Sequence, residues 1–251
     1  MNSDQFSPCV TRKMINEEQT PSGYFYETHL HTSEASACAL SSGKEMAAAY
    51  KKAGYSGIFV TDHFFNGNTA ISSDLTWGER VDQFCKGYEN AKEEGDRIGL
   101  SVFFGWEYGY KGSEFLTMGL GKEFLLSFPD ILQLSIFEYF ALVHENGGFI
   151  IHAHPFREAF YIQKIRLFPE YVDAIEGINA SHLDDSYDQK AIQFAKENNL
   201  PITAGSDAHR SSPLLGGGML FADKIHSGSD FAIAIKESRP VTLMKQYKKA
   251  Y

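Results

Sequence analysis

The chain has 251 residues, of which 43% are hydrophobic, and its formal net charge is −9. This length and composition suit one globular domain over residues 1–251, with enough apolar residues for a sizeable core. The negative charge argues against tight binding of long nucleic acid, but a small anionic substrate remains possible because bound metal ions would supply local positive charge.

The first part of the chain, about residues 1–22, is polar and is expected to form an N-terminal arm. It contains no apolar segment of the kind that signal peptides carry, and no run of about 18 apolar residues predicts a membrane span. The three cysteines, Cys9, Cys38 and Cys85, are widely spaced, so neither a disulfide framework nor a cysteine-based structural zinc site is predicted. These features favour a cytoplasmic protein.

Short apolar runs alternate with amphipathic stretches along the rest of the chain. The short runs predict strands at Tyr24–His31, Gly57–Thr61, Leu100–Tyr108, Phe115–Leu120, Phe149–Ala153, Ala174–Ile178 and Ile202–Ser206. The amphipathic stretches predict helices from Ser42 to Gly54 and at Glu79–Ile98, Ile136–Glu145 and Tyr187–Glu197, then a short helix within Phe231–Tyr251 and a strand at Pro240–Met244. This alternation favours parallel strands with covering helices, in a barrel or a doubly wound sheet.

Residues that commonly bind metals gather at the predicted carboxyl ends of these strands. They comprise six of the nine histidines and three carboxylates: His29, His31, His63, His152, His154 and His209, with Asp62, Glu107 and Asp207. In a parallel α/β barrel all strand carboxyl ends lie on one face, so these side chains are expected to converge on one pocket. Imidazole and carboxylate together suit Zn, Mn or Fe.

The spacing within two of these motifs supports a shared site. His29 and His31, like Asp207 and His209, are two residues apart and so share a face of a strand. Each motif alone also has a structural explanation, such as a turn, a salt bridge or a helix cap, and the prediction rests on their occurrence together. His152 is expected to support the site rather than to bind metal. The other histidines, His144, His182 and His226, are expected to lie in polar surroundings away from it.

The motifs occur in an order that resembles the PHP (polymerase and histidinol phosphatase) superfamily of metal-dependent phosphoesterases. They are His29-Leu30-His31-Thr32, Thr61-Asp62-His63, Gly105-Trp106-Glu107, His154-Pro155 and Gly205-Ser206-Asp207-Ala208-His209, followed by Gly216-Gly217-Gly218. The resemblance covers the chain from about Tyr24 to Gly218.

The resemblance implies an α/β fold, a distorted (β/α)7 TIM-like barrel, with two or three divalent metal ions (Zn, Mn or Fe). The implied metal ligands are His29, His31, His63, Glu107, His154, Asp207 and His209. The implied activity is hydrolysis of a small phosphate ester, a phosphorylated metabolite or a nucleotide, by a metal-activated water.

Three positions depart from the family pattern. Thr28 stands where many members have an aspartate before the first histidine. Many members also have an aspartate or histidine five or six residues after the second histidine, and here Glu34 is the only carboxylate in that stretch and the candidate replacement. After Glu107 many members have a further histidine, which the segment Glu114–Gly119 lacks. A third metal ion is therefore expected to be weaker, differently held or absent.

Roles beyond metal binding are assigned by position. Asp207 and His209 are the predicted catalytic residues, with His209 or an unpaired acid as the proton donor to the leaving group. Arg157 and Arg210, which follow the last two motifs, are candidates for binding phosphate oxygens.

Aromatic residues follow the motifs and could either stack on a substrate ring or pack the loops: Phe64, Phe65, Trp77, Tyr108, Tyr110, Phe156, Phe160 and Tyr161.

Two other functions remain open. One is an amidohydrolase-like hydrolase of a C–N bond, which usually bridges its metals with a modified lysine; only Lys111 lies near a predicted strand end. The other is a non-catalytic metal-binding domain.

Overall fold

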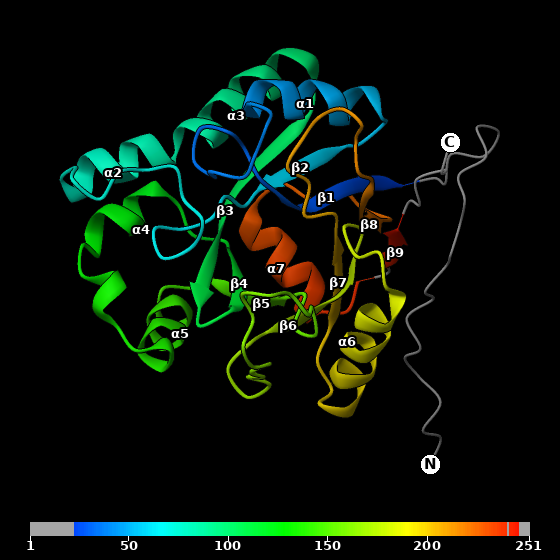
Figure 1. Cartoon of the computed structure of the whole chain (residues 1–251). Helices are drawn as coiled ribbons and strands as arrows, with labels where there is room; N and C mark the ends of the chain where they lie inside the picture. The colour runs from blue at the N-terminus through cyan, green and yellow to red at the C-terminus, as the bar shows by residue number, and fades with distance from the viewer. Residues whose placement is uncertain (1–22, 240, 246–251) are drawn as a thin grey trace.

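The computed structural model describes residues 23–239 and 241–245. Within these residues the strands form one strongly curved sheet in the order β7-β6-β5-β4-β3-β2-β1-β8-β9 (Figure 1). Their bounds are β1 Tyr24–Leu30, β2 Gly57–Val60, β3 Ser101–Tyr110, β4 Ser113–Met118, β5 Phe149–Ala153, β6 Ala174–Asn179, β7 Ile202–Gly205, β8 Gly217–Phe221 and β9 Val241–Lys245. The predicted arm at residues 1–22 and the first residue of the predicted strand, Pro240, lie outside the described residues.

The sheet is mixed, so the expectation of parallel strands throughout was wrong. β3 and β4 are joined by Lys111 and Gly112, both of which have positive φ angles of 51° and 87°. A two-residue turn of this kind reverses the chain and makes β4 antiparallel to β3 and β5. β8, which was not predicted, is antiparallel to both β1 and β9.

The curvature of the sheet brings β1 and the segment after β7 together. The Asp207 N–H donates to the His29 carbonyl over 2.7 Å, and the His31 N–H donates to the Ala208 carbonyl over 2.9 Å. The buried Glu27 carboxylate reinforces this junction by accepting from the Ser206 N–H at 2.8 Å. The predicted distorted TIM-like barrel is therefore confirmed, and its closure joins the first and last predicted motifs.

The helices lie around the outside of this barrel, except for α7, which lies within the curve of the sheet (Figure 1). Their bounds are α1 Gly43–Lys52, α2 Trp77–Phe84, α3 Lys86–Ile98, α4 Lys122–Ser127, α5 Ile136–Glu145, α6 Asp185–Glu197 and α7 Gly228–Lys236, with a 3₁₀ turn at Ile131–Gln133. The predicted capping box of Ser42 and Glu45 begins α1. The single helix predicted at Glu79–Ile98 is two helices, because a second capping box of Thr76 and Glu79 starts α2 earlier and a break at Cys85 separates it from α3.

The end of the barrel opposite the strand carboxyl ends is filled by α7. Phe231 of this helix packs on Phe59 and Phe149, with ring centroids 4.8 and 6.3 Å apart. These aromatic contacts belong to an apolar core that fills one end and leaves the other end for polar groups. No helix in the described residues is long and apolar enough to cross a membrane.

Candidate metal centre

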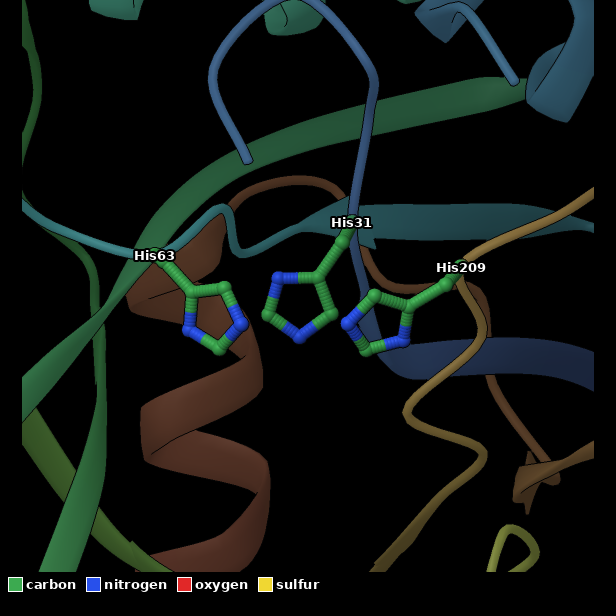
Figure 2. Close-up of side chains that lie close together, drawn as sticks. All are labelled: His31, His63 and His209. Atoms are coloured by element: carbon green, nitrogen blue, oxygen red, sulfur yellow. The ribbon is translucent and has the colours of Figure 1, made fainter. Parts of the chain in front are cut away.

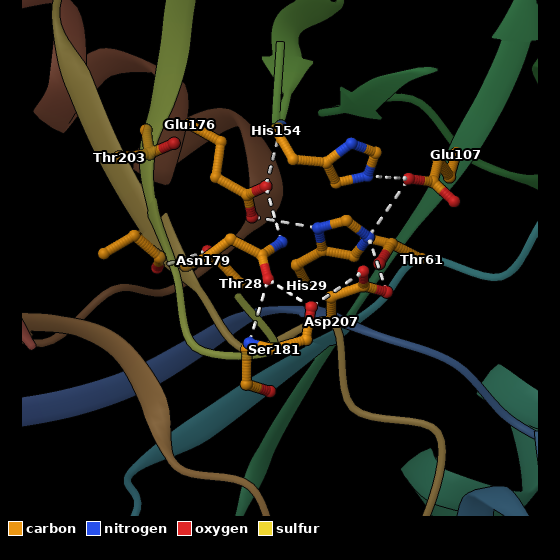
Figure 3. Close-up of polar contacts among 12 residues, drawn as sticks. Thr28, His29, Thr61, Glu107, His154, Glu176, Asn179, Ser181, Thr203 and Asp207 are labelled. Atoms are coloured by element: carbon orange, nitrogen blue, oxygen red, sulfur yellow. Dashed lines mark hydrogen bonds and ion pairs between the residues drawn. The ribbon is translucent and has the colours of Figure 1, made fainter. Parts of the chain in front are cut away.

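The predicted metal ligands come together at the carboxyl ends of the strands, and Figure 3 shows four of them, His29, Glu107, His154 and Asp207. His29 lies in β1 and His31 just after it, His63 follows β2, and Glu107 lies in β3. The remaining members, His154, Asp207 and His209, follow β5 and β7. All except His209 are buried, although each carries a polar or charged group.

Glu107 lies at the centre of this cluster. Its Oε1 is 3.2 Å from His29 Nε2 and 3.2 Å from His154 Nε2. Its Oε2 is 2.7 Å from His63 Nδ1 and 3.7 Å from His31 Nε2. One carboxylate thus faces four imidazoles that come from three different strands, β1, β2 and β5, and together these groups could hold metal ions.

Asp207 forms a second point of convergence beside Glu107. Its Oδ1 is 3.1 Å from His31 Nε2 and 3.6 Å from His29 Nε2, and these two nitrogens are 3.2 Å apart. Burial raises the pKa of Asp207, but the neighbouring Arg157 and His29 outweigh it and hold that pKa well below its usual range. The group therefore presents an ionised carboxylate and two imidazoles to one point.

His31, His63 and His209 form a further group (Figure 2). The His31 ring centroid is 4.3 Å from those of His63 and His209, which are 5.8 Å from each other. Each ring offers one nitrogen within 4.8 Å of the others. Three imidazoles at these separations form a donor set that is typical of zinc and related ions.

Two buried donor atoms of the cluster lack hydrogen-bond partners within the described part of the chain, as metal ligands would in the absence of the ion. Glu107 Oε2 and His63 Nδ1 are buried and close, yet neither has a hydrogen-bond partner of acceptable geometry among the described residues. Burial opposes protonation of His63, but Glu107 and Cys38 raise its pKa to about 11. A divalent ion between such groups would replace protons and satisfy both donors, so the residues present fit the metals that the motifs imply.

Glu114 belongs to the same group but was not predicted. Its Oε2 is 3.5 Å from His154 Nε2 and its Oε1 is 3.8 Å from His63 Nδ1. Glu114 lies near the start of β4, and because β4 is antiparallel its first residues lie beside the carboxyl ends of β3 and β5. Burial and the nearby Glu107 raise the pKa of Glu114 to about 8.

Glu176 of β6 is another member that sequence reasoning missed. Its Oε1 is 2.9 Å from His29 Nδ1, and its Oε2 accepts from the His154 N–H at 3.0 Å. A carboxylate on one nitrogen of an imidazole fixes the tautomer and orients the other nitrogen toward a metal. Glu176 therefore holds His29 with Nε2 toward Glu107 and Asp207.

Asp62 supports the site through hydrogen bonds to the loop after β1. It accepts from Thr32 Oγ1 at 2.6 Å and from Ser36 Oγ at 2.7 Å, and Ser36 Oγ is 3.2 Å from His31 Nδ1. Burial raises the pKa of Asp62 to about 6 despite these hydrogen bonds. Asp62 thus fixes the loop after β1 and, through Ser36, the ring of His31.

Glu34 is not brought to the cluster, contrary to the prediction that it replaces a missing ligand. Its carboxylate accepts from the Gly43 N–H at 3.0 Å and from Asn90 Nδ2 at 2.9 Å. The N-terminus of α1 attracts the carboxylate and holds it away from the metal ligands.

The structure separates the two candidate arginines. Arg157 Nη2 donates to Asp207 Oδ2 over 2.6 Å, and its side chain is only 17% exposed. Its Nε donates to His182 Nε2 over 3.2 Å, so His182 supports the site although it was expected to lie away from it. Arg210 is exposed and does not line the cavity beside the cluster, so its predicted place at the substrate is not supported.

That cavity has a volume of about 500 Å³. It is lined by metal-binding candidates on one side, including His63, Glu107 and Glu114, and by Arg157 and Lys111. Of the aromatic residues considered, Tyr110 and Tyr161 reach it, whereas Phe64 and Phe65 are buried in the core.

Backbone conformation at the site is also unusual. His154 and Asp207 have positive φ angles of 26° and 56°, which residues with a side chain rarely adopt. Hydrogen bonds to Glu176 and His29 hold these two backbones in place. Strain of this kind concentrates at functional sites, where the surrounding structure compensates for its cost.

Other positions noted in the sequence have structural roles. His152 is buried and stacks on Phe115 at 4.7 Å, and burial lowers its pKa to about 3. Thr28 Oγ1 donates to the Ala204 carbonyl over 2.8 Å. Thr117 Oγ1 is 2.6 Å from the Tyr139 hydroxyl, which also accepts from Trp106. These threonines stabilise the barrel where relatives often have site residues.

The sequence and the fold are similar to those of known proteins. A family profile described as PHP-associated matches residues 186–240. No match was found among curated proteins.

Solved structures share the fold. A two-domain protein from Bacteroides vulgatus containing a predicted PHP-like metal-dependent phosphoesterase has a TM-score of 0.68 and 16% identity, over 94% of this chain and 70% of that one. A structure from Bifidobacterium adolescentis, proposed to be a metal-dependent phosphoesterase, has a TM-score of 0.51 and 15% identity over 77% and 90%. The lesion-specific endonuclease EndoQ from Pyrococcus furiosus has a TM-score of 0.57 and 15% identity over 88% and 57%.

At these identities the likeness to solved structures is one of fold. The profile match adds evidence from the sequence, and the residues that it covers include the motif of Asp207 and His209. With the ordered motifs and the barrel, these findings show that the chain is similar in sequence pattern and fold to PHP-like proteins.

Proposed function

We propose that the protein is a metal-dependent phosphoesterase that hydrolyses a small phosphate ester, a phosphorylated metabolite or a nucleotide. The observation that carries this proposal is the placement of Arg157 beside the cluster, since its guanidinium contacts Asp207 and also lines the cavity. Divalent ions bound here would lower the pKa of water and supply the nucleophile. A fixed cation next to them suits an anionic phosphoryl group.

The roles proposed for the residues follow from their contacts. Glu107 and Asp207 would supply carboxylate ligands to the metals, and the imidazoles of His29, His31 and His63 would supply the nitrogen ligands. One ring nitrogen of His209 cannot both donate a proton to the leaving group, as predicted, and bind a metal ion. We assign His209 the role of ligand. The identity of the ions, zinc or manganese, is part of the proposal.

The cavity limits the class of substrate. A volume of about 500 Å³ suits a ligand the size of a metabolite or a nucleotide. Lys111 and Arg157 lie on its wall, so charge complementarity favours a phosphate end group. The net charge of −9 disfavours long nucleic acid as a partner.

The amidohydrolase alternative finds less support in the geometry. It needs a lysine between the metals, and Lys111 instead lies with Nζ 5.2 Å from the centroid of the Tyr110 ring. The donor groups within the described residues consist of histidines and carboxylates.

The test is a hydrolysis assay on the purified protein loaded with Mn²⁺ or Zn²⁺. Nitrophenyl phosphate, bis(nitrophenyl) phosphate and a nitroanilide distinguish a monoesterase, a diesterase and a C–N hydrolase. We expect hydrolysis of a phosphate ester that a chelator abolishes and metal restores. His31→Ala should remove it, whereas the exposed His226→Ala should not. A fully metallated protein that hydrolyses neither phosphate ester would overturn the proposal.

A further inference from the structure

A line of polar contacts connects Arg157 to the last strand of the sheet. Arg157 Nε donates to His182 Nε2 over 3.2 Å, and His182 Nδ1 is 2.7 Å from Asp188 Oδ1. Asp188 lies in α6, and its Oδ2 accepts from Lys245 Nζ of β9 over 2.6 Å. The side chains of His182, Asp188 and Lys245 are between 5% and 10% exposed. Three almost fully buried polar groups thus support the arginine that lines the substrate cavity.

These contacts fix the tautomer of His182. A guanidinium only donates, so His182 Nε2 carries the lone pair that accepts from Arg157. In the neutral imidazole the proton then lies on Nδ1, which donates it to Asp188 Oδ1. The Tyr187 ring packs on the imidazole in a T-shaped arrangement, with centroids 5.3 Å apart. The His182 ring is therefore held in its orientation and is protonated at one defined nitrogen.

Both oxygens of Asp188 face donors. Oδ1 accepts from the Asn179 N–H over 3.2 Å as well as from His182, and Oδ2 accepts from Lys245. An amide at this position could not satisfy both sides, because its NH2 group would face a donor in either orientation. Since the Lys245 ammonium attracts an oxygen, an asparagine here is expected to turn its NH2 group toward His182 and to reverse the tautomer of that ring.

Asp185 offers a matched comparison for Asp188. Both lie in the first turn of α6, and Asp185 Oδ1 is also close to Lys245 Nζ, at 3.0 Å. The carboxylate that is bonded to His182 is that of Asp188. Replacing either aspartate removes a partner of Lys245, so the two replacements differ in the contact with His182.

We propose that Asp188 and Lys245 are positioning residues for substrate binding. They hold His182 as the Nδ1–H tautomer, and His182 in turn holds the guanidinium of Arg157 beside the metal-binding cluster. This inference rests on the proposed function, in which Arg157 binds the phosphoryl group.

The contacts of Arg157 show what this support achieves. Nε is bonded to His182, and Nη2 donates to Ser181 Oγ over 2.9 Å and to Asp207 Oδ2 over 2.6 Å. Nη1 takes part in none of these three contacts. Because a guanidinium is planar, fixing Nε and Nη2 also fixes the direction in which Nη1 presents its hydrogens to a phosphoryl oxygen.

Long-range ¹H–¹⁵N NMR of the imidazoles in the Zn²⁺-loaded protein tests the tautomer without reference to activity. The signals of His182 are assigned by their loss in His182→Gln. We expect the Nδ1–H tautomer in the wild type and in Asp185→Asn, and the Nε2–H tautomer in Asp188→Asn. An Nε2–H tautomer in the wild type, or an unchanged tautomer in Asp188→Asn, would overturn the proposal.

Calorimetric titration of the metal-loaded protein with inorganic phosphate tests the consequence for Arg157. The Kd for phosphate should rise about tenfold in Asp188→Asn and in Lys245→Met, the size of effect typical of losing a supporting hydrogen bond. It should stay unchanged in Asp185→Asn and in Lys245→Arg, which keeps the cation. Thermal unfolding of each variant separates these effects from a loss of folded protein.

The outcomes distinguish this inference from the proposed function. A wild type that binds phosphate, together with an equal Kd in Asp188→Asn and Lys245→Met, would overturn the positioning role and leave the proposed function standing. Equal losses in Asp188→Asn and Asp185→Asn would also overturn it, because they would indicate a general role in the structure of α6. A metal-loaded wild type that neither binds phosphate nor hydrolyses its esters would overturn both.

Discussion

Arg157 and Asp207 form a 2.6 Å ion pair at the edge of the metal-binding cluster. Asp207 uses its other oxygen toward His31 at 3.1 Å, so one carboxylate connects the cation to the metal ligands. Replacing Arg157 with alanine should lower kcat/KM for a phosphate ester by about 100-fold, the usual effect of losing a fixed donor to transition-state charge.

Arg210→Ala is the matched control for that change. Arg210 is exposed and outside the cavity, so its removal should leave kcat/KM unchanged. Steady-state kinetics of both variants make the comparison. Equal losses in the two variants, or none in Arg157→Ala, would show that Arg157 does not act on the substrate.

His182 is expected to position Arg157. Its Nε2 accepts from Arg157, and its Nδ1 is 2.7 Å from Asp188 Oδ1, which fixes the ring. His182→Ala should lower kcat/KM by about tenfold, less than Arg157→Ala, because Ser181 and Asp207 still hold the guanidinium. The double variant should be no worse than Arg157→Ala alone. Additive losses would instead indicate a separate role for His182.

Glu114 is expected to act as the metal ligand that relatives supply with a histidine. Glu114→Gln should lower the number of ions bound per chain, because a neutral amide is a poorer ligand than a carboxylate. Glu114→His should retain the ion, and Glu123→Gln on the exposed side of α4 serves as the control. Elemental analysis measures the three variants. An unchanged metal content in Glu114→Gln would remove Glu114 from the site.

Asp173 provides a pH-dependent contribution to stability outside the metal site. It accepts from the Ile150 N–H at 2.8 Å and pairs with His144 at 2.9 Å and Lys236 at 3.0 Å. Burial opposes ionisation, but these partners hold the pKa of Asp173 below 3.8. A carboxyl group with a lower pKa in the folded state stabilises the fold above its unfolded pKa, and this stabilisation is lost as the pH falls through the folded value.

The variant Asp173→Asn should therefore reduce the free energy of unfolding by about 1–3 kcal/mol near neutral pH. The difference from the wild type should shrink as the pH is lowered below about 4. Urea unfolding at several pH values measures this, with the exposed Asp74→Asn as control. A loss that does not change with pH would contradict the assigned role of the ionised carboxylate.

The sequence predicted the barrel and most of the site because strand ends that carry His, Asp or Glu recur in order. His29, His63 and His154 come from separate strands, and the geometry of a barrel brings them together. The site residues that the sequence could not predict are placed by the direction of a strand and by tertiary contacts. Glu114 lies at the start of a strand, and it reaches the site only because the turn at Lys111 and Gly112 reverses β4.

Two further residues illustrate the same limit. Glu34 was the obvious carboxylate by spacing, but the N-terminus of α1 binds it more directly than the cluster does. Cys38 had no metal-binding pattern around it, and its loop reaches the cavity beside the cluster through the pairing of Leu40 with His209. Spacing along a chain does not report such pairings, whereas the hydrogen bonds of the fold do.

The most direct test is the number of divalent ions bound per chain, measured by elemental analysis of the wild type and of Glu107→Gln. Glu107 contacts four of the histidines, so its loss should affect more than one ion. We predict two or three ions in the wild type and a clear reduction in Glu107→Gln. One ion or none in the wild type, or an unchanged content in Glu107→Gln, would contradict a multi-metal centre.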